Sequence, residues 1–222
     1  MYIIYNMQMK KLCAIILISA SLSNPFHSFA DDIKNKQPIV EKSISSFSEK
    51  FVNAARAYLN KNNRAVPYIW GGRNTENNPG LDCLGLIFVS IQDVTGIPWN
   101  YWSVMPSKLI KQLGDGREVE FFYSENATEK DMIKDLKKGD VIFFLSTAPT
   151  RDKPVTSKKI GNDKIAYWVL HTAIYTGEGK IIHASPFDDD LCVVEENLYQ
   201  FMKNTEMDGF IAKEPKISIK KN

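Results

Sequence analysis

The sequence predicts an α+β domain in which helices come first and an antiparallel sheet follows. Apolar residues recur at helical spacing between residues 46 and 95, whereas short apolar runs typical of strands dominate from residue 141 onward. The chain has 222 residues, 44% hydrophobic and 24% charged, which is enough to bury the core of one domain. We therefore expect N-terminal helices packed on a sheet of about five strands.

The first 30 residues have the pattern of a secretory signal peptide. Lys10 and Lys11 precede an apolar run over residues 12–22, and Ser28-Phe29-Ala30 fits a cleavage site. The run is shorter than the roughly 20 residues that a membrane-spanning helix needs, so we expect no membrane span. The sequence predicts a periplasmic or secreted protein after cleavage near Ala30.

The charge balance gives no reason to expect a nucleic-acid partner. The formal net charge is +2, and removing the leader with its two lysines leaves 26 basic and 26 acidic residues. We expect a monomer with four parts: a signal peptide (1–30), a flexible linker (31–44), one folded domain (45–213) and a C-terminal tail (214–222).

Four helices are predicted. The first begins after Ser46, because Ser46-Phe47-Ser48-Glu49 fits a capping box and apolar residues then recur at helical spacing. The second begins at Cys83, after the Pro79-Gly80 break, and ends before Gly96. Two shorter helices are expected over residues 106–113 and 128–136.

Five strands are predicted: Val141–Leu145, Trp168–Tyr175, Lys180–Ser185, Leu191–Glu195 and Asp208–Lys213. The polar, proline-containing segment 146–163 is expected to be a long loop. Because strands joined in succession by short links pair antiparallel, we expect a meander.

Cys83 has the position expected of a nucleophile. At the start of a helix, unpaired backbone N–H groups and the helix dipole favour the thiolate that attacks carbonyl groups. Beyond the leader, the only histidines are His171 and His183, on two successive predicted strands. A cysteine followed far downstream by histidines is typical of a Cys–His nucleophile pair.

The loop between these two strands decides whether the histidines share a face. If His171 faces His183, then Tyr175 faces Gly179, and the loop is Thr176-Gly177-Glu178. An even-numbered loop would place the imidazoles on opposite faces. The sequence therefore predicts a three-residue loop.

The exported chain has a second cysteine, Cys192, which leaves a disulfide with Cys83 open. Such a bond would abolish thiolate chemistry, and Cys192 is otherwise interpreted as a small buried hydrophobe in a strand. A zinc site from Cys83, Asp82, His171 and His183 lacks closely spaced ligand pairs, so no metal or cofactor is expected.

Four sequence blocks together resemble the NlpC-type cell-wall cysteine peptidases. The blocks are Tyr68-x-Trp70-Gly71-Gly72, Asp82-Cys83-x-Gly85, Leu136-x-x-Gly139-Asp140-x-x-Phe143-Phe144 and His171-x-x-Ile174-Tyr175-x-Gly177-x-Gly179-x-x-Ile182-His183-Ala184-Ser185. The resemblance covers residues 50–213. It implies a papain-like fold with the nucleophile at a helix N-terminus.

By this resemblance, Cys83 is the nucleophile, His171 the general base and His183 the third member that holds the imidazole. The implied reaction cleaves an amide bond in peptidoglycan stem peptides, between D-glutamate and a diamino acid, through a thioester and without a metal. Tyr68 is expected to assist the backbone N–H of Cys83 at the oxyanion, and Asp82 to meet the free amine of the stem peptide.

Leu84 departs from the family pattern, which has serine at this position. Leucine removes a hydroxyl from the predicted substrate pocket and adds bulk, so the stem-peptide specificity stays open. Two alternatives also stay open: an inactive binding or scaffold protein of the same fold, and a hydrolase or acyltransferase that acts on a non-wall substrate.

Overall fold

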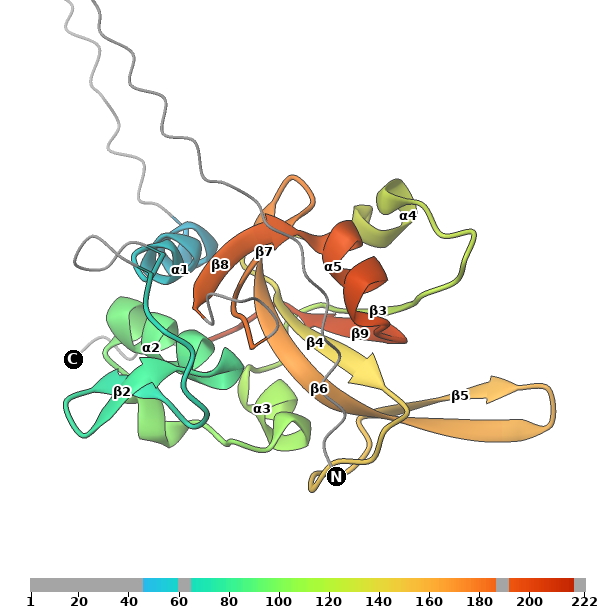
Figure 1. Ribbon diagram of the computed structural model, residues 1–222, viewed down its shortest axis with the longest axis horizontal. Coiled ribbons are helices and arrows are strands. Elements are labelled where there is room, and N and C mark those ends of the chain that lie inside the picture. Colours follow the sequence, from blue (N-terminus) through green and yellow to red (C-terminus); the bar gives the residue numbers. More distant parts are fainter. Residues whose placement is uncertain (1–45, 60–64, 187–191, 218–222) are drawn as a thin grey trace, which may run out of the picture. The chain divides into compact units, whose positions relative to one another are not determined.

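The computed structural model describes residues 46–59, 65–186 and 192–217. The predicted signal peptide and linker lie outside these residues, and the predicted tail is described only as far as residue 217. The described part has the predicted α+β architecture, with N-terminal helices packed on an antiparallel sheet (Figure 1). No helix within it is both long enough and apolar enough to cross a membrane.

The four predicted helices are confirmed, and a fifth follows. In chain order the helices are α1 (Phe47–Arg56), α2 (Cys83–Thr95), the 3-10 turn η1 (Trp99–Tyr101), α3 (Pro106–Gln112), α4 (Glu129–Ile133) and α5 (Leu198–Thr205). The Ser46 hydroxyl accepts the Glu49 N–H at 3.3 Å and caps α1. Gly96, at φ 73°, takes the left-handed conformation that ends α2.

The strands form two antiparallel sheets. They are β1 (Arg73–Thr75), β2 (Asn78–Leu81), β3 (Glu118–Phe122), β4 (Val141–Ser146), β5 (Thr156–Ile160), β6 (Asp163–Gly177), β7 (Lys180–Ala184), β8 (Val193–Asn197) and β9 (Gly209–Lys213). β1 and β2 pair with each other. The main sheet has the order β3-β9-β4-β6-β7-β8, and β5 pairs with β6 outside this path.

Three predictions about the sheet were wrong. The main sheet has seven strands rather than about five, because β3 and β5 also pair into it. It is not a simple meander, since β9 inserts between β3 and β4. Segment 146–163 is not one loop, because Thr156–Ile160 forms a hairpin with the first part of β6. These pairings depend on distant partners, which a local pattern does not reveal.

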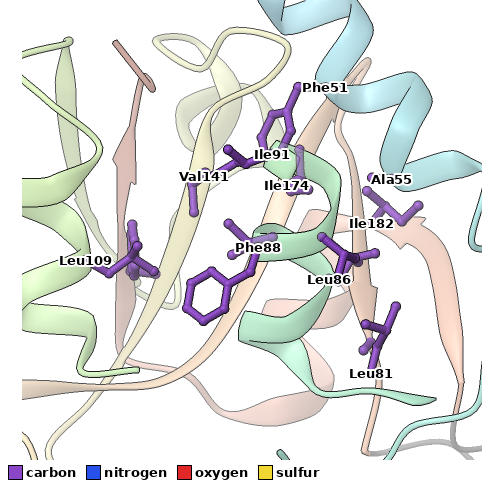
Figure 2. Packing of buried hydrophobic residues seen from close by; sticks show 14 of the residues in the cluster. Phe51, Ala55, Leu81, Leu86, Phe88, Ile91, Leu109, Val141, Ile174 and Ile182 are labelled. Atoms are coloured by element: carbon purple, nitrogen blue, oxygen red, sulfur yellow. The ribbon is translucent and has the colours of Figure 1, made fainter. Parts of the chain in front are cut away.

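The central strands bury apolar side chains on both faces. On one face, α1 and α2 pack against the sheet and form a first apolar cluster with it. Figure 2 shows two residues of this cluster, Phe51 and Phe88, close to Val141 and Ile174. On the other face, α5 contributes to a second cluster. Because both faces are covered, β4 is a continuous apolar run and not an alternating one.

Substitution of Phe88 tests the packing of the first cluster. Its side chain is fully buried, so Phe88→Ala should lower the free energy of unfolding by about 3–5 kcal/mol through lost burial and a residual cavity. Ile160→Ala, at a half-exposed position of the β5–β6 hairpin, should change it by no more than about 0.5 kcal/mol. Urea unfolding of the two variants measures both values, and equal losses would contradict this packing.

Candidate active site

Cys83 is the first residue of α2, as predicted. Asp82 is the N-cap, and its Oδ1 accepts the Gly85 N–H at 2.5 Å. This bond satisfies one of the backbone donors that a helix start leaves unpaired. The helix start that carries the thiol is therefore held by the preceding residue.

Asp82 also joins the helix to the turn at residues 69–72. Its Oδ1 lies 2.7 Å from Arg73 Nη1, and its Oδ2 accepts the Gly71 N–H at 3.0 Å. Gly85 is needed for this close approach, because a Cβ there would lie only 2.2 Å from the Gly72 carbonyl oxygen. The Asp82 carboxylate is thus buried and hydrogen-bonded within the protein, which gives it a positioning role beside the predicted contact with a substrate amine.

Tyr68 lies near Cys83. Burial raises the pKa of its phenol, and electrostatic interactions with Cys83 and Asp82 raise it further. Tyr68 therefore stays protonated and keeps a hydrogen to donate. Leu84 is half-buried and packs against the first cluster.

The two histidines come together in the structure. His171 Nε2 lies 2.9 Å from His183 Nδ1, and the rings meet edge to face with centroids 4.9 Å apart. Both rings are buried, and the aromatic rings of Phe144 and Phe201 lie within 6.0 Å of the His171 ring centroid. Little water reaches this pair.

The loop that joins the two histidine strands differs from the prediction. Tyr175 pairs with Ile181 and Gly177 with Lys180, so the loop is Glu178-Gly179, with two residues. An irregularity between Tyr175 and Gly177 shifts the register by one residue. This bulge restores the parity that an even-numbered loop would have broken, and the histidines share a face for that reason.

A third side chain continues the pair. Glu196 Oε1, on β8, lies 2.8 Å from His183 Nε2. Sequence reasoning missed this residue. The available signal was alternation along β8, because Val194 pairs with His183 and the side chain two residues later projects to the same face.

Cys83 and His171 approach the same part of β6 without a direct hydrogen bond. Polar atoms of Thr172, the neighbour of His171, lie close enough to the sulfur to influence its pKa. Within the described residues, however, Cys83 Sγ makes no hydrogen bond to His171. The histidine pair is formed, whereas the thiol–imidazole bond is not.

The predicted shift of Cys83 toward thiolate is wrong for this structure. Burial raises the pKa of the thiol to about 11, and the Asp82 carboxylate adds to the rise. Contacts with Thr172 and the Leu84 N–H oppose the rise but do not overcome it. The pKa of His171 is well below its ordinary value, mainly because the ring is buried and secondly because of its electrostatic interaction with His183. Both groups are therefore neutral near pH 7.

No disulfide joins Cys83 to Cys192. Among the described residues, no group of three or more histidine, cysteine or acidic side chains could hold a metal ion. A cavity of 440 Å³ among β3, β5, β6 and α5 is lined by none of the predicted site residues.

Part of the chain matches a known protein family. Residues 65–155 match the model of the NlpC/P60 family. The predicted resemblance to this family is confirmed. The NlpC/P60 match includes Cys83, whereas His171 and His183 lie C-terminal to it. No curated protein matches the chain.

Solved NlpC/P60 structures also resemble the chain. The NlpC/p60 domain of the peptidoglycan hydrolase SagA is 20% identical, with a TM-score of 0.41 over 74% of this chain and 97% of that one. A Bacillus cereus NlpC/P60 protein is 21% identical, with a TM-score of 0.42 over 76% and 40%. The peptidoglycan hydrolase RipB from Mycobacterium tuberculosis is 18% identical, with a TM-score of 0.43 over 77% and 65%.

The negative charge of Asp82 should contribute to the raised pKa of the Cys83 thiol. Asp82→Asn removes a carboxylate that raises the pKa of Cys83, so this pKa should fall below about 11. Alkylation of the Cys83 peptide by iodoacetamide, followed against pH by mass spectrometry, should then begin at lower pH. Glu76→Gln makes the same charge change at an exposed turn and should leave the profile in place. An unmoved profile in Asp82→Asn would contradict the assignment.

Burial of neutral His171 should make stability depend on pH. Its pKa is well below 6.5 when folded and near 6.5 when unfolded, so the unfolded chain binds more protons in acid. The contribution of neutral His171 to the free energy of unfolding is fully present above about pH 6.5. It is lost as the pH falls from there toward the folded pKa, by at most about 1.4 kcal/mol per pH unit. Urea unfolding at several pH values measures the slope. His171→Gln, which keeps a donor toward His183, should flatten it; an unchanged slope would refute the cause.

Proposed function

We propose that the protein is an exported cysteine amidohydrolase that cleaves an amide bond in peptidoglycan stem peptides. The family match over residues 65–155 supports a cell-wall hydrolase. The observation that carries the proposal is the pair of buried imidazoles 2.9 Å apart on β6 and β7, with the Cys83 sulfur beside the adjoining Thr172. The substrate is a stem peptide, and the enzyme acts as a monomer outside the cytoplasm without a metal or other cofactor.

The mechanism begins with two neutral groups. His171 takes the Cys83 proton while the sulfur attacks the amide carbon, so proton transfer and attack occur together and no free thiolate accumulates. The oxyanion accepts hydrogen bonds from the Cys83 backbone N–H and from the Tyr68 hydroxyl, which stays protonated. The tetrahedral intermediate expels the amine, which takes the proton from His171, and a thioester remains.

Hydrolysis of the thioester repeats these roles. His171 accepts a proton from water as the water oxygen attacks the thioester carbon, and then returns it to the leaving sulfur of Cys83. His183 orients the His171 ring throughout. Because the thiol–imidazole hydrogen bond is not formed in the free protein, substrate binding has to bring the two groups together.

The bond cleaved is proposed to join D-glutamate to a diamino acid. Asp82 would meet the amine of the stem peptide with the part of its carboxylate that the protein leaves accessible. Leu84 would narrow the pocket and remove a hydroxyl, which favours a less polar group at the adjoining substrate position.

A catalytically inactive binding protein of the same fold is the second candidate. The raised pKa of Cys83 and the missing hydrogen bond to His171 favour it. The two candidates differ in turnover, which a digest measures directly. A hydrolase that acts on a non-wall amide would instead cleave model amides and leave peptidoglycan intact.

Digestion of purified peptidoglycan tests the proposal. The wild-type protein should release fragments whose masses report cleavage within the stem peptide, and Cys83→Ser should release none. His171→Asn should slow release by roughly 10²–10⁴-fold, the usual contribution of a general base. Cys192→Ser is the matched control and should cleave normally. Release by Cys83→Ser, or none by the wild-type protein, would refute the proposal.

A further inference from the structure

The second histidine of the pair, His183, is also hydrogen-bonded to the carboxylate of Glu196. His183 uses one ring nitrogen toward His171, at 2.9 Å, and the other toward Glu196, at 2.8 Å. We propose that Glu196 is a positioning residue that determines which nitrogen of His171 is basic. The inference rests on the proposed function, in which His171 is the base, and it is tested by a property of the histidines themselves.

The direction of each hydrogen bond follows from the chemistry of the carboxylate. An ionised glutamate only accepts, so His183 Nε2 carries the hydrogen that it donates to Glu196. In neutral His183 the other nitrogen, Nδ1, is then an acceptor. His171 Nε2 must therefore donate to it, so in neutral His171 the hydrogen is on Nε2 and Nδ1 is the nitrogen that can accept a proton.

The opposite arrangement would disable the base. If His183 carried its hydrogen on Nδ1, it would donate to His171 Nε2, and neutral His171 would hold its own hydrogen on Nδ1. That nitrogen could no longer take the thiol proton. The position of one hydrogen on His183 thus sets the function of the next ring, as in other relays in which a carboxylate holds a histidine tautomer.

The Glu196 carboxylate interacts with His183 and not with a lysine or arginine of the described residues. Among the described residues, no lysine or arginine forms an ion pair with Glu196, and its side chain is 34% exposed. His183 is fully buried, and the Phe201 ring covers it with centroids 5.0 Å apart. A buried imidazole that is shielded in this way depends on its protein partners to select its tautomer.

The neighbouring Glu195 provides a matched contrast. Its side chain projects to the other face of β8, where Arg56 Nη2 lies 2.6 Å from Oε1 and the Thr176 hydroxyl donates to the same oxygen at 2.6 Å. Adjacent residues of identical chemistry thus serve different partners. Glu195 is satisfied by a cation and a hydroxyl, whereas Glu196 is hydrogen-bonded to an imidazole.

The nitrogen-15 chemical shifts of His171 in the full-length protein test this inference. The wild-type protein should show the Nε2–H tautomer, a measurement that needs no variant, and His171→Gln assigns the signals. In Glu196→Gln the amide can donate as well as accept, so a share of the Nδ1–H tautomer should appear. Cleavage should slow by roughly 10–100-fold in kcat with little change in KM.

Glu195→Gln is the control and should leave the His171 tautomer and kcat unchanged. An Nδ1–H tautomer in the wild-type protein would overturn the inference. It would also be overturned if Glu196→Gln kept the wild-type tautomer, or if the tautomer changed while kcat did not. If no wall fragment is released by any form of the protein, the proposed function fails, whereas the tautomer measurements still decide the role of Glu196.

Discussion

The contact between Asp82 and Arg73 is the constraint on which the rest of the site depends. One buried carboxylate caps α2, pairs with the guanidinium at 2.7 Å and accepts the backbone N–H of Gly71. A buried carboxylate is stable only when its lone pairs are satisfied, so the helix start and the Ile69–Gly72 turn are held in one arrangement. The same charge raises the pKa of Cys83. The carboxylate that fixes the position of Cys83 therefore also disfavours its thiolate form.

Strand β6 carries His171 and presents its side chains alternately to the two faces of the sheet. Thr172 and Ile174 alternate with His171 and Ala173, so neighbouring residues reach different surroundings. Irregularities interrupt its pairing with β4 before His171 and with β7 after Tyr175. Bulges of this kind redirect side chains near functional sites. The irregularity after Tyr175 brings His171 and His183 to the same face despite a two-residue turn.

Neutral thiol and neutral imidazole are a coherent resting state for the proposed amidohydrolase. A permanently charged thiolate reacts with many electrophiles and oxidants, whereas a half-buried thiol of raised pKa reacts slowly until a base is aligned. In the proposed mechanism, substrate binding supplies this alignment. The hydrogen-bonded series Glu196, His183 and His171 would hold the base in its active tautomer before the sulfur approaches.

The sequence alone predicted the first four helices, the central strands and the position of Cys83 at a helix start. These features follow from local patterns: the Ser46 cap, the apolar face of the first helix, the Pro79-Gly80 break and the continuous apolar run of β4. Tertiary structure alone decided the insertion of β9 beside β4, the bulge after Tyr175, the contact of Glu196 with His183 and the raised pKa of Cys83. Each of these depends on the burial or pairing of residues that are distant along the chain, and such distances are set only when the whole core packs.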